Sequence, residues 1–225
     1  MAMAAVGDLS GSAAEDTQGT ILYDQGCAEI QLVPFALMRN DNNLRSAYLN
    51  WLNDHDVVRP IASPALLGSK GPEFVEQGFV RFTRPESRGF FVWYVPDKKF
   101  IGTAKLDSIS IHCRSAWDGI MIGERRYQGR GLAVAVYRVL LAFGFTELRF
   151  NRVSGGCNEN NVPMVKTFHR LGYTLEGRLR QADCIEGQFS DHLYFGILRE
   201  EFFAANNVRL GLKKYNGADF PWNDD

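Results

Sequence analysis

RRYQGRGLAVAV, residues 125–136, sets two glycines directly in front of a run of small apolar residues. The strand-like run WDGIMIG precedes it, and residues 131–148 have the pattern of a long helix that is apolar on most sides. This order leaves Gly129 and Gly131 where the chain turns, so a ligand can approach the exposed N–H groups of about residues 128–133. Backbone donors at the positive end of a helix predict a phosphate site.

The three arginines of this stretch could add charge-assisted contacts to a phosphate, although a tight turn with solvated arginines is the alternative interpretation. Two common phosphate loops are excluded. A Walker A loop requires Lys and then Ser or Thr after its glycines, where this chain has Leu132 and Ala133. A dinucleotide-binding loop requires a third small residue, where this chain has Val134, and an acid after the next strand, where none occurs before Glu159.

The motif Arg126-x-x-Gly129-x-Gly131 at the start of a helix resembles the acetyl-CoA pyrophosphate loop of the GNAT N-acetyltransferase superfamily, whose pattern is Q/R-x-x-G-x-G/A. NENNVPMVKTFHRLGYTLEGRLR, residues 158–180, is similar to that superfamily's next segment, in which an Asn precedes a helix ending in Gly and an aromatic residue. YLNWLNDHDVVRP and HLYFGILREEF are similar to the RimJ/RimL-like branch. The resemblance covers roughly residues 28–204.

This resemblance implies an α/β fold: a single GNAT-type domain with a mixed central β-sheet flanked by helices. Its central parallel strands, here residues 119–123 and 152–156, splay apart around the pantetheine arm of acetyl-CoA, and no metal is implied. The resemblance implies that the following residues bind the acetyl donor: Ile120, Met121, Ile122, Arg126, Tyr127, Gln128, Gly129, Arg130, Gly131, Leu132, Ala133 and Asn161. The apolar trio would suit a β-core equally well, and Asn161 would suit a helix cap.

Acetyl transfer to an amine requires a base, because an alkyl amine with a pKa of about 10 is mostly protonated near neutral pH. Asp118 lies on the strand that enters the site and is the predicted base, with His112 and Glu124 as other candidates. Members of the branch often carry Glu where this chain has Trp117. Neighbouring strand residues face opposite sides, so either the role has moved to Asp118, or that carboxylate is structural and the base lies elsewhere.

A second departure from the family pattern concerns the general acid. Many GNAT enzymes place a Tyr at the position of Phe168 to protonate the departing thiolate, and Phe has no proton to give. Tyr127, Tyr173, His169 and water are the remaining candidates. The thiolate can also leave unprotonated if backbone donors stabilise the oxyanion.

The resemblance implies an acetyl-CoA-dependent N-acetyltransferase that moves an acetyl group to a primary amine by direct attack. VSGGCNENN and IMIG look closer to acetyltransferases of nucleotide-linked amino sugars than to those of ribosomal proteins, so a small-molecule amine is the expected acceptor. A RimJ/RimL-type protein or peptide N-terminal acetyltransferase and a CoA-binding module without catalysis are the alternatives. The sequence leaves the oligomeric state, including a homodimer, open.

Composition indicates a globular chain with no general attraction to nucleic acid or membrane. The 225 residues are 45% hydrophobic, and 25 basic against 26 acidic side chains give a net charge of −1. No signal peptide is evident, and the most apolar segment, 131–145, is interrupted by Arg138, which favours a cytoplasmic location. Four cysteines without a CxxC pair predict reduced, mostly buried thiols.

The remaining pattern gives the domain organisation. Residues 1–27 have few large apolar side chains and are expected to form a flexible tail, with the acetyltransferase domain over 28–225. A strand from Ala28, a helix with Leu44, Tyr48, Leu49 and Leu52 on one face, and a helix with Pro72 in its first turn are followed by three strands. A β-α-β-α-β order then completes the predicted mixed sheet.

Overall fold

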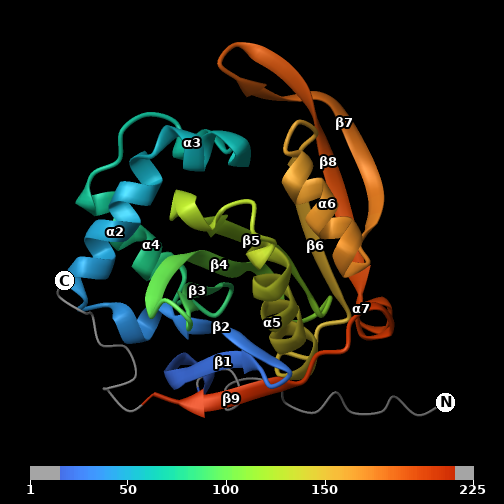
Figure 1. Ribbon diagram of the computed structural model, residues 1–225. Coiled ribbons are helices and arrows are strands. Elements are labelled where there is room, and N and C mark those ends of the chain that lie inside the picture. Colours follow the sequence, from blue (N-terminus) through green and yellow to red (C-terminus); the bar gives the residue numbers. More distant parts are fainter. Residues whose placement is uncertain (1–15, 216–225) are drawn as a thin grey trace.

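The computed structural model describes residues 16–215, which fold around a nine-stranded sheet with the strand order β7-β8-β6-β5-β4-β3-β2-β1-β9 (Figure 1). The strands are β1 (Thr20–Asp24), β2 (Cys27–Pro34), β3 (Arg88–Tyr94), β4 (Lys99–Ser110), β5 (Ser115–Ile122), β6 (Arg152–Asn158), β7 (Thr174–Ile185), β8 (Gln188–Leu198) and β9 (Leu210–Lys214). All neighbours pair antiparallel except β5 and β6, which are parallel. The predicted single α/β domain on a mixed sheet is confirmed.

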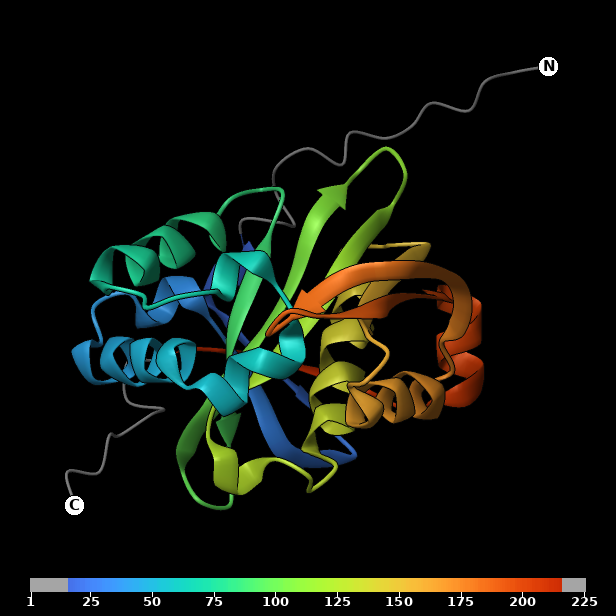
Figure 2. The same ribbon diagram turned by 90° about the horizontal axis from the view of Figure 1, so that it is seen from above.

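Helices cover both faces of this sheet (Figures 1 and 2). They are α2 (Asn42–Asn53), α3 (His55–Val58), α4 (Pro72–Arg81), α5 (Leu132–Thr146), α6 (Val162–Leu171) and α7 (Arg199–Ala205), with short 3-10 turns that include η3 (Arg59–Ile61), η4 (Pro64–Leu66) and η5 (Arg125–Tyr127). Local signals set the helix starts. Asp41 caps α2 by accepting a hydrogen bond from the Leu44 N–H at 2.9 Å, and Pro72 occupies the first turn of α4.

Two apolar cores lie on opposite faces of the sheet. On one face α5 is buried on most sides, as its sequence predicts, and Val136, Leu140 and Phe143 have no exposed surface. On the other face α2 and α4 cover an aromatic cluster in which Phe35 stacks on Phe91 at a centroid distance of 4.0 Å. These faces are called below the α5 side and the α2 side.

The predicted tail boundary at residue 27 is wrong for residues 20–24. β1 is hydrogen-bonded between β2 and β9, and Ile21 and Leu22 have no exposed surface, each in a different core. Pairing on both edges and burial of side chains on both faces offset the entropy that is lost when this short strand is ordered. Residues 1–15 of the predicted tail and residues 216–225 of the predicted domain lie outside the described residues.

The prediction that the thiols are mostly buried is also wrong. Cys157 is buried, but Cys27, Cys113 and Cys184 are exposed. Cys27 begins β2, Cys113 lies in the turn between β4 and β5, and Cys184 lies near the end of β7 in the β7–β8 hairpin, where neither core reaches. All four are free thiols.

The parallel strands β5 and β6 separate after three residue pairs. Ser115, Ala116 and Trp117 pair with residues 152–154, whereas β5 runs on to Ile122 and β6 to Asn158 without further pairing between them (Figure 1). This confirms the predicted splay of the central strands. Along residues 16–215 no helix is both long enough and apolar enough to cross a membrane.

Candidate active site

The glycine loop after β5 has the backbone geometry that its sequence predicts. Gly129 and Gly131 adopt φ values of 73° and 78°, in the left-handed region where side chains other than Gly are strained. α5 starts at the next residue, and no side chain caps its N-terminus. The first N–H groups of α5 therefore remain available to an anion.

The three arginines of the loop have different environments. Arg125 forms ion pairs with Asp54 at 2.5 Å and Asp56 at 2.6 Å, so it ties the loop to α3. Arg126 and Arg130 are exposed, and neither pairs with a carboxylate in the part of the chain that the structure describes. These two guanidinium groups are the cations available to a phosphate at this loop.

Tyr127 supports those two arginines and is itself buried. The guanidinium carbons of Arg126 and Arg130 lie 4.8 and 5.3 Å from the centre of its ring. Its hydroxyl donates a hydrogen bond to Asp97 at 2.5 Å, and burial raises the pKa of Tyr127 to about 12. Tyr127 therefore keeps its proton and acts as an apolar platform, which removes it as a candidate acid.

A pocket of about 450 Å³ lies between the end of β5, the glycine loop and α6, and is called the loop pocket. It is lined by Val57, Pro60, Ile61, Ile120, Met121, Ile122, Tyr127, Gln128, Gly129, Gly131, Leu132, Ala133, Asn161, Val162, Pro163, Met164, Lys166, Thr167 and Arg170. Ten of the twelve predicted donor-binding residues thus meet here, and Arg126 and Arg130 flank it. The β5 edge that faces β6 is unpaired beyond Trp117, so its backbone is open to an extended ligand.

Asn161 has the alternative role that the sequence left open for it. Its side-chain oxygen accepts a hydrogen bond from the Met164 N–H at 3.2 Å and so caps α6. Its amide nitrogen donates to the Pro60 carbonyl at 3.0 Å. Asn161 therefore joins α6 to η3 across one wall of the loop pocket.

Asp118 faces the α5 side of the sheet and is half-buried. Tyr137 donates a hydrogen bond to one carboxylate oxygen at 3.0 Å, and Tyr173 donates to the other. Burial raises the pKa of Asp118 to about 7, and the two phenol hydrogen bonds offset part of that rise. Burial and the Asp118 carboxylate raise both tyrosine pKa values well above the usual range.

The other predicted acid–base candidates are engaged or distant. Both oxygens of Glu124 have partners: Trp51 donates to one at 3.0 Å, and Lys99 pairs with the other at 3.1 Å. His112 is exposed in the turn between β4 and β5. Phe168 is buried and stacks on Phe195 at 4.7 Å. The catalytic role predicted for Asp118 stays a prediction.

Trp117 points to the face opposite Asp118, as strand alternation predicts. It is 40% exposed, and its ring meets the Tyr194 ring edge-on at 5.5 Å. His192, two residues away on β8, lies 5.0 Å from the same Tyr194 ring. Aromatic rings from β5 and β8 therefore lie next to one another on the α2 side of the sheet.

A polar cluster that sequence reasoning missed includes His192. Nδ1 of His192 is 3.1 and 2.9 Å from the two oxygens of Asp183. Asn158 donates to Asp183 at 2.9 Å and to the Ser190 hydroxyl at 2.6 Å. These four residues, here called the hairpin cluster, come from β6, β7 and β8.

An irregularity in β7 brings Asp183 to His192. The β7–β8 register shifts between Leu179, which pairs with His192, and Asp183, which pairs with Ser190. Gln181 within this bulge adopts a φ of 53°. The sequence separates the two residues by nine positions and contains no local signal for the bulge, so only a His and an Asp in adjacent predicted strands could have suggested the contact.

Two further cavities lie next to the loop pocket, under the β7–β8 hairpin. A junction cavity of about 320 Å³ shares Pro60 and Asn161 with the loop pocket. It shares Arg59, Ile185 and Glu186 with a hairpin cavity of about 800 Å³, which is lined by residues within 52–69 and by 182–186. The three cavities are neighbours from the α5 N-terminus to the hairpin tip, and the residues that adjoining cavities share form the walls between them: Asn161 bonds to Pro60, and Arg59 pairs with Glu186.

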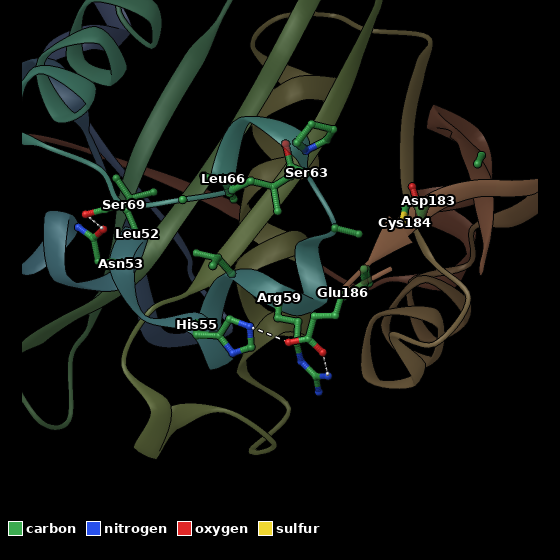
Figure 3. Close-up of a pocket in the computed structure, with 17 residues that line it drawn as sticks. Leu52, Asn53, His55, Arg59, Ser63, Leu66, Ser69, Asp183, Cys184 and Glu186 are labelled. Atoms are coloured by element: carbon green, nitrogen blue, oxygen red, sulfur yellow. Dashed lines mark hydrogen bonds and ion pairs between the residues drawn. The ribbon is translucent and has the colours of Figure 1, made fainter. Parts of the chain in front are cut away.

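An ionic bridge lies at the boundary between the hairpin cavity and the junction cavity. Figure 3 shows His55 and Arg59, from α3 and η3, directed at Glu186 at the hairpin tip. The two carboxylate oxygens of Glu186 lie 3.1 Å from His55 and 3.7 Å from Arg59. Asp183 of the hairpin cluster lines the hairpin cavity, so the cluster lies within reach of a molecule held there.

Among residues 16–215, no group of three or more His, Cys, Asp or Glu side chains is placed to hold a metal ion. The sequence is 30% identical over 102 residues to the Uncharacterized N-acetyltransferase p20 of Bacillus licheniformis, a match that covers 45% of this chain and 57% of that protein. It is 27% identical over 113 residues to the Spermidine N(1)-acetyltransferase of Escherichia coli K12, covering 50% and 60%. The chain thus spans less than two thirds of these relatives.

Solved structures share the fold at lower identity. The spermidine N-acetyltransferase of Vibrio cholerae, in complex with CoA and spermine, has a TM-score of 0.69 at 20% identity over 79% of this chain and 99% of that one. The Microcin C7 self immunity acetyltransferase MccE, in complex with acetyl-CoA and AMP, has a TM-score of 0.62 at 20% identity over 76% and 93%. The family model of the acetyltransferase (GNAT) domain matches residues 37–174. That match covers more than half of the sequence, and the chain belongs to the GNAT acetyltransferase family.

Proposed function

We propose that this chain is an N-acetyltransferase that binds acetyl-CoA in the loop pocket and transfers the acetyl group to the primary amine of a small acceptor held in the hairpin cavity. The α5 N-terminus, Arg126 and Arg130 hold the pyrophosphate. The unpaired edge of β5 bonds the pantetheine arm, and the splay between β5 and β6 lets the thioester meet the amine.

The size of the hairpin cavity supports a small acceptor. Its volume of about 800 Å³ matches that of pockets for ligands of a few hundred daltons. Glu186 at the hairpin tip pairs with His55 and Arg59, so the hairpin is held against α3 and η3 at this cavity. The volume is the observation that carries the proposal of a small-molecule acceptor over a protein N-terminus.

The charge of the cavity supports an acceptor with a mostly neutral body. Its acidic side chains are Asp183 and Glu186, and both already have partners in the hairpin cluster and in the ionic bridge. A polyamine carries several positive charges that need several free carboxylates. The hydroxyls of Ser63 and Ser69 in the lining fit sugar hydroxyls better.

An amino sugar, including one linked to a nucleotide, is therefore the acceptor class that we propose. Arg59 lines both the junction cavity and the hairpin cavity, where it is placed to pair with the phosphates of a linked nucleotide. The RimJ/RimL-like branch, the cytoplasmic location and the open choice between monomer and homodimer stay predictions from the sequence.

The test is a thiol-release assay with the full chain, acetyl-CoA and four acceptors: a nucleotide-linked amino sugar, D-glucosamine, spermidine and a peptide with a free N-terminus. We expect the amino sugars to have the highest kcat/KM, and Arg59→Gln to lower it for the nucleotide-linked substrate more than for D-glucosamine. Preference for the peptide would instead support an N-terminal acetyltransferase. Tight acetyl-CoA binding without turnover of any amine would support a module without catalysis.

A further inference from the structure

We propose that His192 is the general base of this enzyme, with Asp183 and Asn158 as its positioning residues, an assignment that rests on the acetyltransferase function proposed above. Nε2 of His192 takes the proton of the incoming amine. The proposal takes the alternative that the sequence left open, in which the Asp118 carboxylate is structural and the base lies elsewhere. Trp117 stands where related enzymes often carry a Glu, and His192 would supply the base from a different strand, β8.

The hydrogen-bond chain of the hairpin cluster fixes which ring nitrogen carries the proton. The Asn160 N–H donates to the side-chain oxygen of Asn158 at 2.9 Å, so the Asn158 amide nitrogen is the atom that faces Asp183. An ionised carboxylate only accepts hydrogen bonds, so Nδ1 of His192 must be the donor to Asp183. Nε2 of the neutral ring then keeps its lone pair and can accept a proton.

That lone pair lies beside the gap between β5 and β6. A methyl group on Gly156 would be 2.6 Å from Nε2, so the imidazole lies against β6 at a position where the absence of a side chain makes room for the ring. Gly156 is two residues beyond Ser154, the last β6 residue that pairs with β5. Along residues 16–215, Nε2 of His192 has no hydrogen-bond partner, and the side chain is 23% exposed.

The hairpin cluster borders two of the cavities. Asp183 lines the hairpin cavity, and Asn158 and Ser190 line the junction cavity. His192 itself lines none of the three cavities, but its ring contacts Asp183 and lies against Gly156 on β6, the strand next to the open edge of β5. The proposed base thus lies next to the cavities from which an amine would approach the thioester.

Atoms and charge balance in the proposed acetyl transfer. The acceptor arrives as an ammonium ion, and neutral His192 takes one proton at Nε2 to become an imidazolium. The free amine attacks the thioester carbonyl carbon, a C–N bond forms, and the C–S bond breaks with its electron pair on sulfur. The second amine proton passes to the thiolate or to solvent, and His192 returns its proton to water, so the products are the amide, CoA and one proton.

Several titratable and charged groups surround His192. Asp183 lies on β7, Tyr194 on β8, and Cys157 on the opposite face of β6, where burial raises the pKa of the Cys157 thiol to about 12. Arg59, His55 and Glu186 face the cluster across the cavities. Arg178 pairs with Asp191 and with Glu159 nearby. Asp183 is the carboxylate in direct contact with the ring.

The experiment measures kcat against pH with saturating D-glucosamine, with spermidine and glycinamide in parallel, for full-length His192→Gln, Asp183→Asn and the control His112→Gln. We expect His192→Gln to lower kcat about 10²- to 10⁴-fold and to remove the acid limb of the profile. Asp183→Asn should shift that limb to lower pH, because the imidazolium loses its carboxylate. The exposed His112 control should match the wild type.

Unchanged melting temperature and acetyl-CoA affinity in His192→Gln will separate lost chemistry from lost fold. Full turnover by His192→Gln would overturn the assignment while leaving the acetyltransferase function intact. An acid limb of the kcat–pH profile that stays at the same pH in Asp183→Asn would do the same. If the wild type acetylates neither these three amines nor a nucleotide-linked amino sugar, the proposed function fails, and this assignment fails with it. Histidine-labelled NMR gives an independent check, since a proton on Nε2 rather than Nδ1 in the neutral ring would also contradict it.

Discussion

Asp118 and Asp183 are both carboxylates held by two side-chain donors, yet they lie on opposite faces of the sheet and differ in what their partners can do. The partners of Asp118 are the phenols of Tyr137 and Tyr173, whose pKa values burial raises well above the usual range. The partner of Asp183 is an imidazole that retains a free lone pair. A carboxylate can direct proton transfer only when its partner exchanges protons near neutral pH.

The hydrogen-bond network of Asp118 is therefore structural, whereas the network of Asp183 and His192 is the one proposed to transfer protons. Asp118 lies where β5 and β6 begin to part, and it ties β5 to α5 and to the residue that precedes β7. The hairpin cluster lies against the cavities on the α2 side. We therefore expect changes on the α5 side to alter stability and changes on the α2 side to alter turnover.

The largest expected effect is a loss of stability, caused by a deletion that removes side chains from both apolar cores. Deleting residues 1–27 removes β1, which contributes Ile21 to one core and Leu22 to the other. The truncated chain should lose its cooperative thermal transition or melt at least 10 °C lower, since burial of two such side chains contributes several kcal/mol. Circular dichroism will show this, with a deletion of residues 1–15 as reference. An unchanged melting temperature would mean that β1 adds nothing to the fold.

Substitutions at two neighbouring glycines of β6 test the two networks separately. A methyl group on Gly155 would lie 2.6 Å from Asp118 and 2.8 Å from the Phe168 ring, whereas one on Gly156 would lie 2.6 Å from Nε2 of His192. Gly155→Ala should lower the melting temperature by several degrees, because the buried network must shift. Gly156→Ala should lower kcat about 10- to 100-fold at nearly constant melting temperature. The opposite assignment of the two effects would break the comparison.

Binding of the acetyl donor should depend on the glycine loop and on neither network. Gly131→Val forces a β-branched residue into a φ of 78°, which displaces the N–H groups of the loop. Its acetyl-CoA dissociation constant should rise at least tenfold, about 1.4 kcal/mol. Gly187→Val at the hairpin tip, where φ is 79° and space is equally open, is the matched control for strain and should bind acetyl-CoA normally. Calorimetry giving equal affinities for the two variants would remove the loop from the binding site.

A further expected effect is a change in the pH dependence of stability. Burial raises the pKa of Asp118 to about 7 in the folded chain, above about 3.9 in an unfolded one. The folded state therefore binds the extra proton between these values, so this contribution to stability is complete below about pH 4 and is lost as pH rises through about 7. Urea unfolding at pH 5, 6.5 and 8 should show a flatter dependence for Asp118→Asn. Parallel curves would place Asp118 in a solvated environment.

The parts of the site that the sequence predicts are those with local physical causes. Gly129 and Gly131 mark positive φ values before a helix, and strand alternation places Trp117 and Asp118 on opposite faces. Phe168 at the position of the usual acid is visible from the motif alone. These signals extend over a few residues, so the order of elements and the loop pocket were predictable.

The rest depends on pairing between distant segments. β1 is held by β9, almost two hundred positions away, and its five residues look too short and too polar at their ends to predict a strand. His192 reaches Asp183 through a bulge at Gln181, and Asn158 joins them from a third strand. A register shift in a two-stranded hairpin leaves no periodic trace in the sequence, so the hairpin cluster could not be predicted.

The most direct test of the two networks is the ratio of kcat values for Asp118→Asn and His192→Gln, measured in one assay at pH 7.5 with saturating D-glucosamine and acetyl-CoA. Both substitutions keep approximate shape and remove one proton-accepting group. The account predicts that Asp118→Asn retains kcat within tenfold of the wild type, while His192→Gln loses about 10²- to 10⁴-fold. A loss of that size in Asp118→Asn with full turnover in His192→Gln would contradict the account and place the base on the α5 side.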